Sequence, residues 1–156
     1  MTQSSDYTVS SLIKPSSGRC KGSTFVIWDV GGQEKLRPLW RSYVRNTDII
    51  VVVVDSSEPE RFEEAKLELI NLIRSSGLPS SVPVLLLANK QDLPLAQDSA
   101  SVETALGIRD LAHPTRPTLT LGCCAITGEG LDDVFDRMHD LIIKSRKQDK
   151  GKRRKS

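Results

Sequence analysis

Three short polar clusters could carry chemistry, and each follows directly after an apolar run. They read Asp29-Val30-Gly31-Gly32-Gln33, Asn89-Lys90-Gln91-Asp92 and Cys124-Ala125-Ile126-Thr127-Gly128-Glu129-Gly130. Carboxylate and amide side chains accept or donate hydrogen bonds and can hold cations, and glycine lets a backbone N–H approach a ligand closely because it has no Cβ. The clusters therefore predict a binding site for a polar ligand.

The apolar runs before these clusters have the composition of β-strands. Thr24 to Val30 is β-branched and aromatic, and Asp48 to Asp55 contains six consecutive Ile and Val residues. Val82 to Ala88 repeats that pattern, and Thr118 to Cys124 can supply a last strand. Continuous aliphatic runs are typical of strands that are buried on both faces of a parallel sheet.

Stretches with helical spacing separate these strands. One amphipathic stripe runs from Pro59 to Gly77, a weaker one covers Ala100 to Leu106, and a closing helix carries a stripe from Leu131 to Ile142. Strands that alternate with helices predict an α/β fold, with a mainly parallel sheet and helices on both faces. Ligands bind such sheets at the carboxyl ends of the strands, so we expect the three polar loops to converge there.

Composition limits the class of protein without revealing its function. The 156 residues, 38% hydrophobic and 27% charged, are typical of one soluble domain. Cys20, Cys123 and Cys124 form no C-x-x-C pair, so we expect a reducing compartment, with the adjacent cysteines as buried packing. The longest apolar run is too short to cross a bilayer and no leader opens the chain, which predicts a protein that is not secreted.

We divide the chain into three parts. Residues 1–23 form a poorly specified arm that could supply one hairpin strand, residues 24–143 form the globular domain, and residues 144–156 form a basic tail. The tail holds eight basic residues and one acidic residue, whereas the whole chain has a net charge of only +2. The tail is therefore electrostatically distinct from the rest of the chain.

The motifs D-x-G-G-Q, N-K-x-D and C-A-x-x-G-E-G, in this order, resemble the third, fourth and fifth nucleotide-binding motifs of the Arf and Arf-like small GTPases. The segment from Phe25 to Tyr43, with Trp28 directly before Asp29, is similar to that family's second switch. With the basic tail, the likeness is closest to the Arf-like-four branch, from about Thr24 onward. It implies a three-layer, P-loop-NTPase-like G domain that binds GTP or GDP with Mg²⁺.

On the phosphate side, the resemblance implies three roles. Asp29 would orient Mg²⁺ directly or through water. Gly32 would allow a backbone N–H to reach the γ-phosphate. Gln33 would be the catalytic residue that positions the attacking water, because a neutral amide can donate and accept at once.

On the base side, the resemblance implies that Asp92 selects guanine. Its carboxylate would accept hydrogen bonds from the ring N–H and the exocyclic amine together, a pair that adenine does not offer. Lys90 would lay its aliphatic stem along the base, and Asn89 would tie neighbouring loops together. Ala125, next to Cys124, would present its backbone N–H to the guanine carbonyl oxygen.

One part of the family pattern is absent from the sequence. No G-x-x-x-x-G-K-[ST] occurs, and the only Gly-Lys pair is Gly151-Lys152, which Arg153 follows. This motif cradles the α- and β-phosphates and helps to hold Mg²⁺. We therefore expect a G domain without its first strand, P-loop and first helix, with two inner strand edges unpaired and GTP binding weakened.

Two functions remain open. The first is a GTP-dependent switch in membrane traffic or signalling, with slow GTP hydrolysis and with effector, exchange and GTPase-activating proteins as partners. Trp28, Trp40 and Tyr43 would pack in the core or on the switch face, where effectors of the family bind. The alternative, favoured by the missing phosphate loop, is a nucleotide-free G-domain remnant that binds proteins and membranes.

The tail has three interpretations. Residues 144–156 could be a solvated end, could bind anionic lipids at the plasma membrane or endomembranes, or could direct nuclear import through Lys152-Arg153-Arg154-Lys155. Nucleic-acid binding is not expected, because the tail lacks interleaved aromatic residues. The predicted location is cytoplasmic and peripheral to membranes, with nuclear entry as the alternative.

Overall fold

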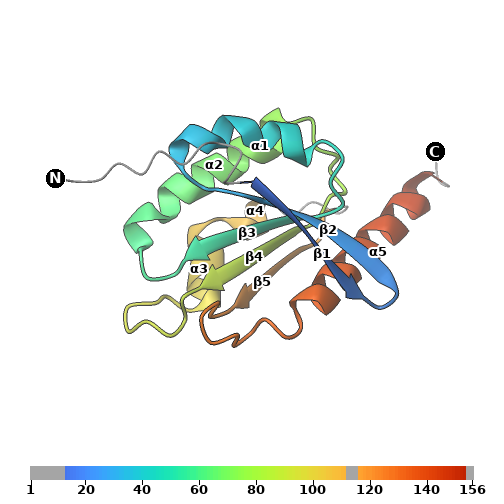
Figure 1. Ribbon diagram of the computed structural model, residues 1–156. Coiled ribbons are helices and arrows are strands. Elements are labelled where there is room, and N and C mark those ends of the chain that lie inside the picture. The colour runs from blue at the N-terminus through green and yellow to red at the C-terminus, as the bar shows by residue number, and fades with distance from the viewer. Residues whose placement is uncertain (1–12, 112–115, 154–156) are drawn as a thin grey trace.

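The computed structural model describes residues 13–111 and 116–153. Figure 1 shows the arrangement of the elements. The strands are β1 (Ile13–Cys20), β2 (Ser23–Val30), β3 (Ile50–Asp55), β4 (Val84–Asn89) and β5 (Thr118–Gly122). The α-helices are α1 (Arg37–Val44), α2 (Phe62–Ser75), α3 (Ser99–Ala105), α4 (Ile108–Leu111) and α5 (Val134–Arg153), and two short 3-10 turns are η2 (Glu34–Leu36) and η3 (Pro59–Arg61).

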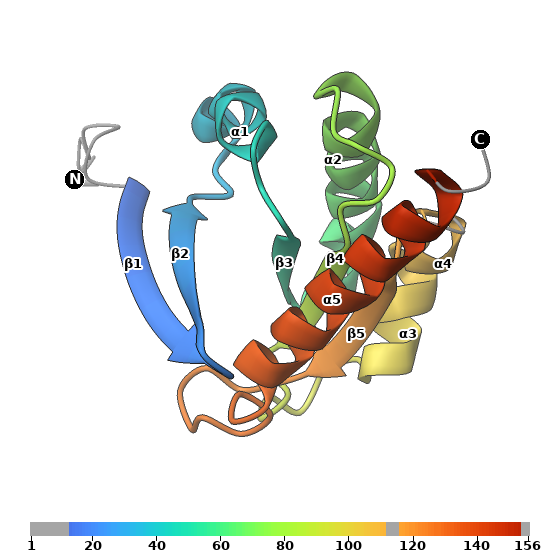
Figure 2. The ribbon, with the colours of Figure 1, turned by 90° about the vertical axis from the view of Figure 1, so that its right-hand side faces the viewer.

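The strands form two sheets. β3, β4 and β5 make a three-stranded parallel sheet in the order β3-β4-β5, and β1 and β2 make a separate antiparallel hairpin. Figure 2 shows the hairpin standing apart from the edge strand β3. β2 and β3 therefore belong to separate sheets, because no strand in the described part of the chain hydrogen-bonds to both of them.

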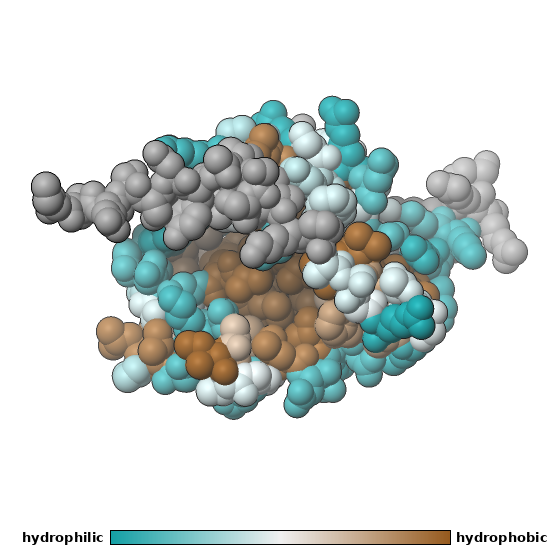
Figure 3. Space-filling view, in the orientation of Figure 1, coloured by the Kyte–Doolittle hydropathy of each residue, from teal (hydrophilic) through white to brown (hydrophobic). Residues whose placement is uncertain are grey.

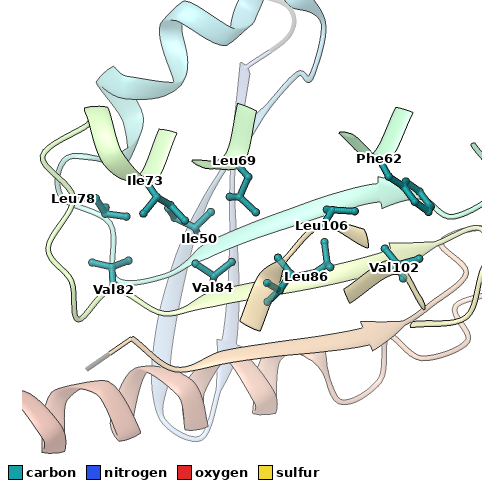
Figure 4. Close-up of a cluster of buried hydrophobic side chains, with 12 residues drawn as sticks. Ile50, Phe62, Leu69, Ile73, Leu78, Val82, Val84, Leu86, Val102 and Leu106 are labelled. Carbon is teal, nitrogen blue, oxygen red and sulfur yellow. The ribbon is translucent and has the colours of Figure 1, made fainter. Parts of the chain in front are cut away.

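β4 lies at the centre of the core. Val84, Leu86 and Ala88 pack on one face against α2 and α3, in the cluster drawn in Figure 4. Leu85 and Leu87 point to the other face and pack against α5. Successive residues of a strand point to opposite faces, so this continuous aliphatic run is buried on both sides. The three-layer α/β class expected from the sequence is confirmed.

The β1–β2 hairpin turns at Lys21 and Gly22, which both have positive φ, at 49° and 76°. Two-residue turns of this kind match the twist of the strands that they join. The hairpin contacts α5, where the Phe25 and Phe135 rings meet edge to face at 5.7 Å. Lys21 donates a hydrogen bond to Asp140 at 3.1 Å. The second half of the predicted arm is therefore a paired strand, while residues 1–12 lie outside the described residues.

Two helical features differ from the sequence-based expectations. Helix α1 was not predicted, although Pro38 lies in its first turn, a position that favours helix initiation. Helix α5 does not end near residue 143 but continues through the basic segment to Arg153, so that part of the tail is helical. Arg154, Lys155 and Ser156 lie outside the described residues. No helix among residues 13–111 and 116–153 is long and apolar enough to cross a membrane.

Candidate functional site

The carboxyl ends of β3, β4 and β5 lie at one edge of the parallel sheet, where their arrowheads point to the same side in Figure 1. β3 ends at Asp55, which is in register with Asn89 at the end of β4. β5 ends at Gly122, directly before Cys123 and Cys124. The second and third polar clusters of the sequence therefore meet at this edge.

Asn89 connects the loops that follow β4 and β5. Its Oδ1 accepts a hydrogen bond of 2.9 Å from the backbone N–H of Ala125. The backbone N–H of Gln91 donates to the carbonyl oxygen of Cys123 at 3.1 Å, so the two loops are joined twice. These bonds fix the position of Ala125 relative to the Asn89-Lys90-Gln91-Asp92 loop.

Asp92 lies beside this junction with its side chain exposed to solvent. The thiol of Cys124, which is 1% exposed, donates a hydrogen bond of 3.1 Å to Asp92 Oδ1. Both cysteines of the pair are buried, as expected for packing residues. Burial also raises the pKa of the Cys123 thiol, which keeps it protonated and chemically inert. Asp92 is thus held in place through one carboxylate oxygen while it faces solvent.

Lys90 has two features that the sequence did not indicate. Its backbone φ is 65°, a left-handed conformation that is uncommon for a residue with a side chain. Its ammonium group forms an ion pair with the carboxylate of Asp55. Asp55 also accepts hydrogen bonds from Ser57, at 3.0 Å from the backbone N–H and 2.6 Å from the hydroxyl. Lys90 is therefore anchored to the end of the neighbouring strand.

The pair of Asp55 and Lys90 predicts a pH effect on stability. Burial alone would raise the pKa of Asp55, but the hydrogen bonds from Lys90 and Ser57 outweigh it and hold that pKa below its ordinary value. The stabilisation is therefore complete above the ordinary aspartate pKa and is lost as the pH falls through the lowered one.

We expect Asp55→Asn to lower the melting temperature at pH 7, and the difference from the unsubstituted protein to shrink as the pH falls below the ordinary aspartate pKa. Thermal melts followed by circular dichroism from pH 7 to pH 2.5 measure this. Asp98→Asn is the control variant, because it leaves the Asp55–Lys90 pair intact. Asp98 is exposed, and the backbone N–H of Ser101, at the start of α3, lowers its pKa by donating to its carboxylate. A constant gap across the pH range for Asp55→Asn would contradict the prediction.

Three further residues at this edge were not predicted from the sequence. Asp55, Ser56 and Gln91 link the ends of β3 and β4, because the Gln91 side-chain amide donates to Ser56 Oγ at 3.0 Å. Ser56 is fully buried, and its backbone N–H donates to the carbonyl oxygen of Asn89 at 3.0 Å. One signal was available, since Asp55 ends an aliphatic strand as Asp29 does.

The first polar cluster forms a separate group at the end of β2. Trp40 Nε1 donates to the carbonyl oxygen of Gly31 at 3.1 Å, and Arg37 Nε donates to that of Gly32 at 3.1 Å. A Cβ added at Gly31 would lie only 2.7 Å from a methyl group of Leu36, whereas one added at Gly32 would meet nothing within 4 Å. A side chain at the first glycine would therefore force Gln33 and Leu36 to move, whereas no contact in the described structure excludes one at the second.

The aromatic residues lie beside this group. The rings of Trp28 and Tyr43 are 5.6 Å apart, and Trp28 remains largely exposed. Arg37 pairs with Glu68 at 3.2 Å and so holds α1 against α2. These contacts pack the start of α1 against the end of β2.

The two groups are not joined by contacts. No hydrogen bond or ion pair within residues 13–111 and 116–153 links Asp29 or Gln33 to Asn89, Asp92 or Ala125, since β2 belongs to the other sheet. No set of three or more His, Cys, Asp or Glu side chains in the described part of the chain could hold a metal ion. A Mg²⁺ ion held by Asp29 would therefore depend on nucleotide and water for most of its ligands.

Comparisons with known proteins place the chain in a family. Residues 8–142 match the model of the ADP-ribosylation factor family. The chain is 52% identical over 134 residues to ADP-ribosylation factor-like protein 4D of Homo sapiens, and the alignment covers 86% of this chain and 66% of that protein. It is 48% identical over 143 residues to protein 4A of the same organism, an alignment that covers 92% of this chain and 70% of that protein. It is 45% identical over 143 residues to protein 4C, an alignment that covers 92% of this chain and 73% of that protein. The chain thus spans about two thirds of the length of these relatives.

The fold has a solved relative. The Arl6 BBS3 small GTPase from Trypanosoma brucei, solved with bound nucleotide analogue GppNp, superposes with a TM-score of 0.77 at 25% identity. The superposition covers 92% of this chain and 86% of that structure. The sequence motifs, the family match over most of the chain and this fold agree, and the chain belongs to the ADP-ribosylation factor family.

Proposed function

We propose that this chain binds guanine nucleotides at the carboxyl edge of β3, β4 and β5 and acts as a GTP-dependent switch. The observation that carries the proposal is the hydrogen bond between Asn89 Oδ1 and the Ala125 N–H. It sets two loops at a fixed spacing, beside the exposed carboxylate of Asp92 and the stem of Lys90. This arrangement suits a flat heterocycle that offers two donors on one edge and a carbonyl oxygen on another, which is the pattern of guanine.

The phosphate side of the proposed site is less complete. Gly32 and Gln33 would contact the γ-phosphate and the attacking water, and Asp29 would orient Mg²⁺, which supplies charge neutralisation of the phosphates when bound. No phosphate-cradling G-x-x-x-x-G-K-[ST] occurs in the sequence. We therefore propose that base contacts supply most of the affinity of this chain, and that hydrolysis is slow without a helper protein.

A competition titration tests the proposal. With a fluorescent GDP analogue as the probe, guanosine, GDP and GTP should each displace it, and ATP should not. Guanosine and GTP should differ in affinity by less than about tenfold, because few phosphate contacts are retained. A folded chain, checked by circular dichroism, that shows no displacement by any guanine compound would refute the proposal and favour the nucleotide-free interaction module.

We further propose that the carboxyl-terminal half of α5 binds anionic membrane surfaces. Lys144, Lys147 and Lys150 are exposed on this helix, while Arg146 pairs with Asp48 at 2.8 Å. Each basic residue near an anionic lipid surface contributes about 1 kcal/mol. This would place the protein in the cytoplasm at the plasma membrane or endomembranes, with nuclear import as an alternative use of the tail.

Changing Lys144, Lys147 and Lys150 together to glutamine is expected to weaken binding to phosphatidylserine vesicles about 100-fold, since three contributions of about 1 kcal/mol are lost. Vesicle co-sedimentation at two salt concentrations measures this. Lys35, Arg41 and Arg45, all exposed outside the tail, provide a triple glutamine control with the same change in net charge. Equal losses in the two triple variants would show that net charge, and not α5, governs the interaction.

The neighbourhood of α1 is the proposed contact surface for regulators. Trp28 is exposed and packs at a tilt against Tyr43, and the indole N–H of Trp40 donates to the Gly31 carbonyl oxygen. A γ-phosphate bound near Gly32 would pull on the same segment and could change the aromatic surface. Effector, exchange and GTPase-activating proteins are proposed to read this surface.

A further inference from the structure

The two carboxylate oxygens of Asp55 have different partners. Oδ1 accepts hydrogen bonds from Ser57, at 3.0 Å from the backbone N–H and 2.6 Å from the hydroxyl. Oδ2 forms the ion pair with the ammonium group of Lys90. The bonds from Ser57 fix the orientation of the carboxylate independently of Lys90, so the end of β3 presents Oδ2 as an acceptor in a set position.

The backbone of Lys90 is held as well. Asn89, directly before it, is in register with Asp55 at the end of β4. The carbonyl oxygen of Lys90 accepts a hydrogen bond of 3.1 Å from the N–H of Leu93, which closes a turn. The turn holds the Cα of Lys90 and Asp55 holds its ammonium group, so the four-carbon stem between them is restrained at both ends.

The restrained stem of Lys90 is still accessible to a ligand, since the side chain is 49% exposed. Leu95 and Ile126, in the neighbouring loops, are 75% and 89% exposed, so few contacts hold their side chains. Figure 3 shows hydrophobic side chains at its lower left, where the loops that follow β4 and β5 lie in Figure 1. Lys90 differs from these residues because its methylene surface is both exposed and already ordered.

We propose that Asp55 is a positioning residue of the base site, a role that rests on the guanine binding proposed above. It holds the ammonium group of Lys90 so that the methylene stem can cover one face of the guanine ring. A free lysine side chain loses rotamer freedom when a ligand orders it, and this loss weakens binding. Asp55 imposes the order before the ligand arrives, so removal of its charge should lower guanine affinity about tenfold.

The ion pair also determines what Lys90 contributes to the ligand. The hydrogen bond with Asp55 raises the pKa of Lys90, so its ammonium group stays protonated beside a carboxylate that balances its charge. The contribution of Lys90 is therefore the apolar surface of its stem. Both oxygens of Asp55 already accept from protein donors, so Asp55 acts through Lys90 and not on the ring itself.

A double-mutant cycle on the full chain tests this role. The ligand is guanosine, in competition with a fluorescent GDP analogue whose own affinity is measured for each variant. Guanosine carries no phosphate, so a change of charge at Asp55 cannot act through phosphates. Asp55→Asn keeps the shape of the side chain and should weaken guanosine binding about tenfold, and Lys90→Met, which lacks the anchored ammonium group, should have a similar effect. Adding Asp55→Asn to Lys90→Met should cause a further loss of less than about twofold, because no lysine remains to be positioned.

Acetylation of lysines provides a readout that needs no nucleotide. An activated acetyl ester reacts with the unprotonated amine, and mass spectrometry measures the rate at each lysine. In Asp55→Asn the rate at Lys90 should rise about fivefold or more, while the rate at Lys144, exposed on α5, should stay constant. Asp98→Asn makes the same chemical change at a carboxylate that caps α3, and it should alter neither the rate at Lys90 nor the affinity for guanosine.

Three results would overturn the positioning role and leave the guanine site in place. One is unchanged guanosine affinity in Asp55→Asn, and another is an unchanged acetylation rate at Lys90 in that variant. The third is a loss on the Lys90→Met background as large as in the unsubstituted protein, since Asp55 would then support the edge of the sheet and not the lysine. A folded, unsubstituted protein that binds no guanosine would instead refute the proposed guanine site and the positioning role with it. Circular dichroism melts set a temperature at which every variant is folded.

Discussion

Replacing Asp92 with asparagine is expected to lower the affinity for GDP and GTP about 100-fold. A hydrogen bond to a charged group contributes about 1.5 to 3 kcal/mol, and the carboxylate would accept two from guanine. In the structure one carboxylate oxygen of Asp92 accepts from the Cys124 thiol at 3.1 Å and the side chain is exposed. The asparagine amide has nearly the same shape, so the fold should be preserved while an acceptor becomes a donor.

The measurement is the competition titration described above, extended to a xanthine nucleotide. Xanthine carries a carbonyl oxygen where guanine carries its amine, so Asp92→Asn should bind xanthosine diphosphate more tightly than the unsubstituted protein does. Glu129→Gln neutralises an exposed carboxylate in the neighbouring loop and should leave guanine affinity within about twofold. Unchanged GDP affinity in Asp92→Asn would remove the base-binding role from this residue.

The sequence predicted the parallel sheet well because its signals are local. The aliphatic runs at β3 and β4 and the stripe of α2 each contain enough information to assign the element. β1 is different, since Pro15, Ser16, Ser17 and Gly18 have low strand propensity and the strand exists through pairing with β2. Tertiary pairing overrides propensity there, and sequence reasoning could offer a strand only as one alternative.

The site was predictable to a similar degree. Asn89, Asp92 and Ala125 come together because parallel strands end at the same edge, a rule that needs no coordinates. The partnership of Lys90 with Asp55 depends on the left-handed backbone at Lys90, which the sequence does not signal. Asp29 is not joined to the other residues by contacts, since the division of the sheet separates β2 from β3. That Asp29 and Asp92 contribute to one nucleotide site stays a prediction.

The last prediction concerns Gly130, which closes the loop that holds Ala125. Its φ is 74°, a conformation that costs a residue with a side chain about 1 to 2 kcal/mol. An added Cβ would also overlap the carbonyl oxygen of Gly122 and lie 3.2 Å from Cys123 Cα, and both are backbone atoms that cannot rotate away. Overpacking of this kind costs about 1 to 3 kcal/mol more.

Gly130→Ala is therefore expected to lower the free energy of unfolding by about 2 to 5 kcal/mol, measured by urea denaturation. Gly128 provides the matched control, because its φ is 83° but an added Cβ meets nothing within 4 Å. Gly128→Ala should cost only the backbone strain, about 1 to 2 kcal/mol. The backbone N–H of Cys124 donates to the carbonyl oxygen of Glu129 at 2.9 Å, which ties Gly130 to the residue before Ala125. A shift of Gly130 that relieves the clash should therefore displace Ala125 as well. The Gly130→Ala variant should consequently bind guanine nucleotides more weakly even under conditions where it is fully folded. Equal effects of Gly130→Ala and Gly128→Ala would show that the contact with Gly122 does not constrain the loop.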